Sequence, residues 1–196
     1  MATTALNDER LWQNLRLNEE RAFSTLFERY YPQLLGYGNS LLSDPEKVKD
    51  CVQNVFMDVW RYRHALTDKV VVKTYLLSSL RKRIARLNER EHIFQKTTNL
   101  DAVEFSLNFS IEDQLIADEE TAAKVQQLNR LINALPTRQK EALYLRYHQG
   151  LAVDQIAEIL NINHQSVSNL LHRAILCLRK DWVGDLALLF LLLQIS

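Results

Sequence analysis

The sequence is poor in residues that interrupt helices and poor in cysteine. Its 196 residues include 4 glycines and 3 prolines. An all-β sandwich or barrel needs a turn about every 8–12 residues, so this scarcity argues against one. The two cysteines, Cys51 and Cys177, lie far apart and lack the spacing of metal ligands, which argues against a zinc site or a disulfide scaffold. We therefore expect an all-α protein without a metal or cofactor, in a reducing compartment.

The chain also shows no secretory signal, because its first ten residues lack the basic-then-apolar order of such a segment. The apolar run Leu186–Leu193 has eight residues, whereas a membrane-spanning helix needs about 20. We therefore expect a cytoplasmic protein with no membrane span. An exposed apolar segment tends to find a partner, so we expect the tail 183–196 to fold back onto the protein or to mediate self-association.

The net charge is zero, with 24 basic and 24 acidic residues, but the charges are separated along the chain. Residues 69–90 contain seven basic residues and one acidic residue, whereas residues 91–124 contain eight acidic and two basic residues. Residues 125–181 contain seven basic and four acidic residues. Basic blocks commonly contact nucleic acid, although either block alone is also consistent with a solvated helix face.

Apolar residues recur at three- and four-residue steps through a first predicted domain, residues 9–91, as amphipathic helices require. Pro32 interrupts the pattern, and Ser43-Asp44-Pro45 predicts a capped helix start. The helices of this domain are expected over about 9–30, 33–42, 45–63 and 71–91. The third should bury a stripe of valines, namely Val48, Val52, Val55 and Val59.

Periodicity weakens over residues 92–123, where acids accumulate, which predicts an acidic linker with a short helix over about 111–118. Helical order returns in a second predicted domain, residues 124–182. Its first helix should stop at Pro136, and its second should be capped by Thr137 and ended by Gly150. The helices of this domain are expected over about 123–135, 138–149, 155–160 and 164–179.

Residues 153–174 have helix-turn-helix form. Ala157 is small where two helices must approach closely, Ile162 plugs the turn, and Val167 packs the second helix against the first. Short polar side chains then face outward near the start of the second helix, where they suit base edges and phosphates in a major groove. The predicted DNA-binding residues are His164, Gln165, Ser166, Ser168, Asn169, His172 and Arg173. The alternative is a helical hairpin with a polar exterior.

The stretch Ala134–Tyr147, followed by Gly150-Leu151 and the helix Ile156–Leu160, resembles region 4 of bacterial sigma factors of the sigma-70 family. It is most similar to the extracytoplasmic-function (ECF) group. The stretch Ala22–Pro32 independently resembles the opening of sigma region 2. Asp50–Trp60 resembles the polymerase-binding helix of that region, and Tyr75–Arg83 falls where the family melts promoter DNA. The resemblance covers about 10–90 and 125–181.

This resemblance implies an RNA polymerase sigma factor that has no catalytic residues and binds promoter DNA at its −35 and −10 elements. It implies as partners core RNA polymerase, through the β′ clamp helices and the β flap, and an anti-sigma factor. The residues implied to bind polymerase are Asp50, Gln53, Asn54, Met57 and Trp60. The residues implied to bind the −10 element and separate its strands are Lys69, Lys73, Tyr75, Arg81, Lys82, Arg83 and Arg86, with the loop 65–72 as the wall of a base pocket.

Several readings stay open at this point. Trp60 and Tyr75 are also consistent with core positions, and the linker is either a nucleic-acid mimic in the polymerase cleft or a solvated tether. A stand-alone helix-turn-helix regulator, dimeric on a palindromic operator, is one alternative for the whole chain. The other is a helical adaptor or anti-regulator whose basic face docks an acidic protein.

Overall fold

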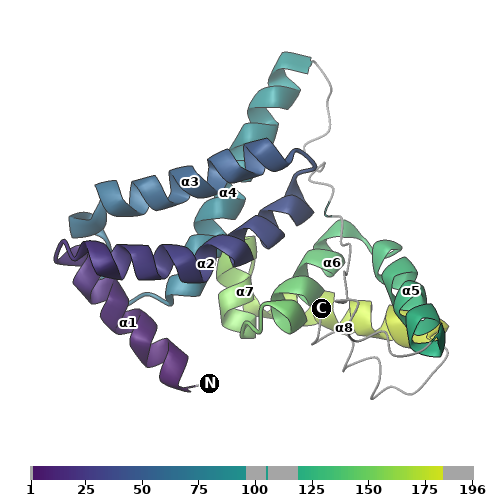
Figure 1. Cartoon of the computed structure of the whole chain (residues 1–196). Helices are drawn as coiled ribbons and strands as arrows, with labels where there is room; N and C mark the ends of the chain where they lie inside the picture. The colour runs from purple at the N-terminus through teal and green to yellow at the C-terminus, as the bar shows by residue number, and fades with distance from the viewer. Residues whose placement is uncertain (1, 96–104, 106–118, 183–196) are drawn as a thin grey trace. The chain divides into compact units, whose positions relative to one another are not determined.

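The computed structural model describes residues 2–95, 105 and 119–182, which divide into two units, Met1–Val103 and Glu104–Ser196 (Figure 1). Every element in these described ranges is a helix, and they contain no strand. This confirms the all-α class with two helical domains. The helix expected over 111–118 and the apolar tail 183–196 lie outside the described residues.

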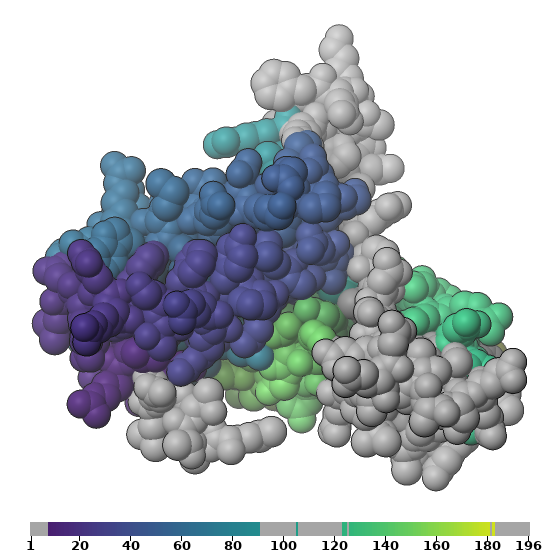
Figure 2. All heavy atoms as spheres, viewed as in Figure 1, coloured from purple at the N-terminus to yellow at the C-terminus, as the bar shows by residue number. Residues whose placement is uncertain are grey.

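The first unit packs four α-helices around one core. These are α1 (Ala2–Arg16), α2 (Glu20–Leu41), α3 (Pro45–Arg61) and α4 (Val72–Gln95), with a short 3₁₀ turn, η1 (Arg63–Ala65), between α3 and α4. In Figure 1, α3 runs alongside α2 and α4 crosses behind both. Figure 2 shows the purple and blue atoms of α2 and α3 as one continuous surface. All four valines of the predicted stripe are buried, as are Leu76 and Leu80 of α4.

The prediction of one continuous helix over 9–30 is wrong, because the chain turns between α1 and α2. Asn18 adopts a left-handed conformation with φ 72°, and the Glu19 N–H donates to the Asn14 carbonyl at 3.0 Å. Asparagine tolerates this conformation, and the bond satisfies a carbonyl at the helix end. The apolar spacing continues across the turn, which is why periodicity alone did not reveal it.

The predicted interruption at Pro32 is also wrong, because α2 continues through it. Proline removes one hydrogen bond inside a helix. The carbonyl that loses its partner is that of Glu28; Glu28 and Pro32 are both exposed residues, while Tyr30 and Leu34 on either side of Pro32 are buried. Burial of the flanking turns holds the helix together. Near its end, Gly38 allows α3 to approach closely, since a Cβ there would lie 2.5 Å from Val48 Cγ1.

The predicted start of α3 is confirmed. The Asp44 side chain accepts hydrogen bonds from the N–H groups of Glu46 and Lys47, at 3.1 and 3.2 Å, and Pro45 occupies the first turn. The helix ends at Arg61, two residues earlier than expected. Helix α4 instead extends to Gln95, four residues beyond the predicted end and into the segment expected to be linker.

The second unit contains α5 (Glu119–Asn133), α6 (Thr137–Leu143), the π-helical turn η3 (Tyr144–His148), α7 (Val153–Leu160) and α8 (His164–Asp181). Phe105, from the predicted linker, is buried against Tyr144 with ring centroids 5.7 Å apart. The Tyr144 hydroxyl accepts a hydrogen bond from Gln149 Nε2 at 3.0 Å, and burial raises the pKa of Tyr144 to about 12. One linker residue is therefore part of this core.

Several predicted boundaries of the second unit need correction. Helix α5, expected over 123–135, runs over Glu119–Asn133 and so begins inside the predicted linker. Thr137 is the first residue of α6 and not its cap, which is Pro136. The helix expected over 138–149 changes to π-helical geometry at Tyr144. Gly150, with φ +65°, then follows the end of this π-helical turn. Helix α7 begins at Val153, so Asp154 lies within its first turn.

Candidate nucleic-acid interface

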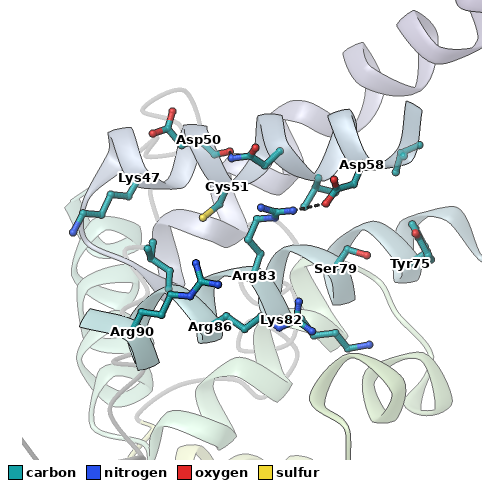
Figure 3. A pocket seen from close by; sticks show the side chains of 14 residues that line it. Lys47, Asp50, Cys51, Asp58, Tyr75, Ser79, Lys82, Arg83, Arg86 and Arg90 are labelled. Atoms are coloured by element: carbon teal, nitrogen blue, oxygen red, sulfur yellow. Dashed lines mark hydrogen bonds and ion pairs between the residues drawn. The ribbon is translucent and has the colours of Figure 1, made fainter. Parts of the chain in front are cut away.

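A groove of about 470 Å³ lies between α3 and α4 in the first unit (Figure 3). Successive turns of α4 line one wall with basic side chains, and Tyr75 and Ser79 continue this wall toward the start of the helix. The opposite wall is α3, which contributes acidic and neutral groups and one lysine. The basic residues of the α4 wall are Lys82, Arg83, Arg86 and Arg90; the polar residues of the α3 wall are Lys47, Asp50, Cys51, Asn54 and Asp58.

One ion pair crosses the groove. The Arg83 guanidinium contacts the Asp58 carboxylate, and Figure 3 shows the Arg83 side chain reaching from α4 toward α3. The two side chains are 36% and 50% exposed, so water screens the pair. Lys82 and Arg86 are exposed. The groove therefore presents positive charge along α4, with the charge of Arg83 offset by its acidic neighbour.

Cys51 lies deeper in the same groove. Burial raises the pKa of its thiol, and this outweighs the opposing effect of the Arg83 charge. The thiol is thus kept in its neutral form and acts as a small apolar group in the groove floor.

The structure gathers only part of the residues predicted to bind the −10 element. Tyr75, Lys82, Arg83 and Arg86 line the groove. Arg81 lies on the opposite flank of α4, because it is two positions before Arg83 and two successive residues rotate about 200° around a helix axis. Lys73 also lies elsewhere: burial lowers the pKa of its ammonium group, and the nearby Asp8 charge acts against that. Lys69 is exposed in the loop between η1 and α4.

Tyr75 belongs both to the groove and to the core. Its ring packs edge-on against Trp12 of α1, with centroids 5.2 Å apart and an interplanar angle of 64°. Burial raises the pKa of its hydroxyl. The ring therefore packs on α1 and also borders the groove.

The five residues predicted to bind polymerase occupy two sides of α3. Asp50 and Asn54 turn toward the groove, whereas Gln53 and Met57 are exposed outside it. Met57 is 65% exposed, which is unusual for so large an apolar side chain. Trp60 is half-buried, so part of its surface is consistent with a core position and the rest is exposed and open to a partner.

Trp60 belongs to an aromatic cluster between α2 and α3. Its ring lies 5.1 Å from that of Phe23, and the Arg63 guanidinium lies 4.2 Å above it. Phe27 packs on Phe56 with centroids 4.8 Å apart. This partly exposed cluster borders Met57 on α3 and offers an apolar surface with fixed rings, a composition typical of protein interfaces.

In the second unit, α7 and α8 form the predicted helix-turn-helix. Asn161 ends α7 with φ 52°, and the Ile162 N–H donates back to the Ala157 carbonyl at 3.1 Å. The Asn163 side chain then caps α8 by accepting a hydrogen bond from the Ser166 N–H at 2.7 Å. Two asparagines thus fix the angle at which α8 leaves the turn, and Val167 anchors it in the core.

The exposed face of α8 carries four of the seven predicted DNA-binding residues in one stripe. Gln165, Asn169, His172 and Arg173 are exposed, and Gln165 Nε2 donates to Asn169 Oδ1 at 3.1 Å. This bond aligns two side-chain amides beside each other. Ser166 and Ser168 are half-buried flanking positions, and His164 Nε2 lies 3.8 Å from Asp154 of α7.

Sequence reasoning missed several contributors to these surfaces. Asp58 and Lys47 share the helical phase of Asp50 on α3, so that phase was an available signal. Arg90 lies in the basic block 69–90 but was not among the residues predicted to bind DNA. The stacking of Arg63 on Trp60 had no signal in the sequence, because it depends on how η1 turns.

The described parts of the chain hold no group of three or more His, Cys, Asp or Glu side chains arranged to bind a metal ion. Among the described helices, none combines the length and apolar character that crossing a membrane requires.

Comparison with known proteins identifies both units. Residues 26–91 match the family model "Sigma-70 region 2", and residues 125–178 match "Sigma-70, region 4". Together these matches span more than half of the chain, in the order the family has them. The chain belongs to the sigma-70 family of RNA polymerase sigma factors.

Its relatives narrow this to the ECF group. The chain is 24% identical over 165 residues to the ECF RNA polymerase sigma factor SigX of Bacillus subtilis, covering 82% of this chain and 84% of SigX. It is 22% identical over 181 residues to the RNA polymerase sigma-H factor of Pseudomonas aeruginosa, covering 87% and 91%. It is therefore an ECF sigma factor, a class that binds core RNA polymerase and promoter DNA to initiate transcription.

Two solved structures share the fold. CnrH in complex with the cytosolic domain of CnrY superposes with a TM-score of 0.60 at 16% identity, covering 89% of this chain and 96% of CnrH. The sigma factor RpoE of Bartonella quintana, in complex with the anti-sigma factor NepR, also gives 0.60, at 19% identity, covering 81% and 94%. At these identities the likeness concerns the fold.

Proposed function

We propose that the groove between α3 and α4 binds the separated non-template strand of the −10 element. The observation that carries this proposal is the row of basic side chains on consecutive turns of α4, with Tyr75 at one end. Lysine and arginine neutralise phosphates, and an aromatic ring beside them offers a surface on which an unstacked base can pack. The loop leading into α4, which carries Lys69, borders the same end of the row.

The exposed side of α3 is proposed to bind core polymerase at its β′ clamp helices. Met57 is the central contact, because a large exposed apolar side chain beside fixed aromatic rings gains most from being covered. Gln53 and Trp60 flank it. Asp50 and Asn54, which face the groove, are assigned to its rim and would contact polymerase only along their exposed edges.

Helix α8 is proposed to read the −35 element in the major groove. The paired amides of Gln165 and Asn169 present both donors and acceptors at one point of the helix. Arg173, one turn further, is placed to neutralise a phosphate. Region 4 is also proposed to contact the polymerase β flap, as the family resemblance implies.

The remaining assignments follow from the family. The protein acts without enzymatic activity of its own, in the cytoplasm, where bacterial RNA polymerase works. An anti-sigma factor is a proposed partner, since both structural neighbours were solved in complexes and one of these partners is an anti-sigma factor.

A run-off transcription assay tests the proposal. The chain is mixed with core RNA polymerase and a genomic promoter library, and transcripts with defined start points are expected. A stand-alone regulator would bind DNA without producing such transcripts, and an adaptor would do neither. The recovered promoter also supplies the DNA needed for the experiments below.

Variants of single surfaces assign the residues. Met57→Asp should weaken binding to core polymerase at least tenfold without changing the melting temperature, because the side chain is exposed. Leu17→Asp is the matched control, since Leu17 is 79% exposed but lies outside α3. Equal polymerase affinity in the two variants would refute the assignment of the α3 surface.

A further inference from the structure

Helix α1 lies outside the region of the chain that the sigma region 2 model matches, which begins at residue 26. Its far end, together with the turn into α2, contacts the segment that connects α3 to α4. We call this segment, residues 62–71, the α3–α4 loop. It leads directly into the helix that carries the basic wall of the groove.

Three polar contacts join α1 and its following turn to this loop. Trp12 Nε1 donates a hydrogen bond to the Thr67 carbonyl at 3.0 Å. The Arg16 guanidinium forms an ion pair with Asp68. Arg63 Nε donates to Asn18 Oδ1 at 2.5 Å. These contacts are spread over the loop from its 3₁₀ turn to Asp68.

Trp12 also contacts the first turns of α4. Its indole is 1% exposed and packs edge-on against Tyr75, so one buried ring contacts both the loop and the aromatic end of the groove. The Tyr75 N–H donates to the Val71 carbonyl at 3.0 Å, which connects the loop to the first turn of α4.

The loop itself buries little surface. Thr67, Asp68 and Lys69 are exposed, and Val71 is 53% exposed. A segment with few buried apolar contacts receives little positional restraint from packing, so its conformation depends on specific bonds from its neighbours. Here those bonds come from α1 and from the turn that follows it.

We infer that Trp12, Arg16 and Asn18 form a brace that holds the α3–α4 loop and Tyr75 in position to receive an unstacked base of the opened promoter strand. This inference rests on the proposed function of the groove. The three brace residues are positioning residues: they touch the loop and Tyr75 from the protein side and act on DNA through them.

Two polar contacts of the brace can be removed while Trp12, its buried member, is kept. Asn18→Gly deletes the acceptor for Arg63, and glycine suits the left-handed conformation at this position. Arg16→Gln deletes the ion pair with Asp68, whereas Arg16→Lys retains its charge. Trp12→Phe keeps an aromatic ring beside Tyr75 but deletes the bond to Thr67.

The experiment uses holoenzyme assembled from core polymerase and each full-length variant. The first probe is the fluorescein-labelled single strand that spans the −10 element of the recovered promoter, and the second is its −35 duplex. Anisotropy gives both affinities, and thermal unfolding and core binding are measured in parallel. Val48→Ala is the control, because it removes buried volume near the start of α3, at the opposite end of that helix from the loop.

The Asn18→Gly/Arg16→Gln double variant should bind the single strand about three- to tenfold more weakly, as expected for losing two charge-assisted contacts. Its −35 affinity and core affinity should stay at wild-type values, and its melting temperature should fall less than that of Val48→Ala. Asn18→Gly/Arg16→Lys should recover part of the loss. Val48→Ala should lower the melting temperature without changing strand affinity. If loss of stability alone weakened strand binding, Val48→Ala would weaken it as well.

Wild-type strand affinity in both the double variant and Trp12→Phe would overturn the inference. The variant Lys82→Ala/Arg86→Ala distinguishes failure of the brace from failure of the groove as the strand-binding site. If that variant binds the strand weakly while the brace variants bind normally, the brace alone is refuted. If it binds the strand as wild type does, the groove is not the strand site, and the inference is overturned together with it.

Discussion

Neutralising one acid in the groove should strengthen binding to the opened strand. Asp58 contacts Arg83 across the groove, so the arginine charge is already offset before DNA arrives. Asp58→Asn removes that offset and leaves the guanidinium free for a phosphate. The pair is 36% and 50% exposed, so its loss should change the free energy of unfolding by only about 0–1 kcal/mol.

The size of the effect follows from counterion release. Each phosphate neutralised on a single strand changes the slope of log K against log salt by about 0.7. If the affinities of the two proteins converge near 1 M salt, one further phosphate contact corresponds to a gain of about fivefold at 0.1 M. Asp58→Asn should therefore bind more tightly and show a steeper salt dependence.

Salt titrations of strand anisotropy with holoenzyme measure both quantities. Asp50→Asn is the matched control, because it removes one negative charge from the same wall, and no ion pair with Arg83 is found there. Arg83→Gln/Asp58→Asn should return the slope to the wild-type value. Weaker binding of the strand by Asp58→Asn, or an unchanged slope of log K against log salt, would refute the prediction that Arg83 binds a phosphate once Asp58 is neutralised.

Three further outcomes are expected. Arg173→Ala should weaken −35 duplexes of all sequences in a salt-sensitive way, whereas Gln165→Ala should change which sequences are preferred; competition binding distinguishes them. Gly38→Ala should destabilise the first unit by about 1–3 kcal/mol in thermal unfolding, because its Cβ would meet Val48 at 2.5 Å, and Val48→Ala should restore part of this. Burial raises the pKa of Tyr144 from 10.0 to about 12, so above pH 10 the unfolded chain loses this proton before the folded chain does. The free energy of unfolding should therefore be unaffected below pH 10 and fall by about 3 kcal/mol as the pH rises to 12. Tyr144→Phe should show a smaller alkaline loss.

Much of the candidate site was predictable because helices have a fixed period. The valine stripe determined which face of α3 is buried, and the spacing of Gln165, Asn169 and Arg173 determined that they share one exposed face of α8. The side on which Met57 is exposed follows in the same way. These are properties of residues along one element, which the sequence lists directly.

The sequence by itself determined the all-α class, the two domains and their family, because apolar period, helix caps and charge blocks are local signals. Tertiary packing alone decided the rest. It carried α2 through Pro32, since buried turns on both sides outweigh one lost hydrogen bond. It also set Arg83 opposite Asp58 and Trp12 against Tyr75, because side chains 25 and 63 positions apart meet only when the helices that carry them pack together.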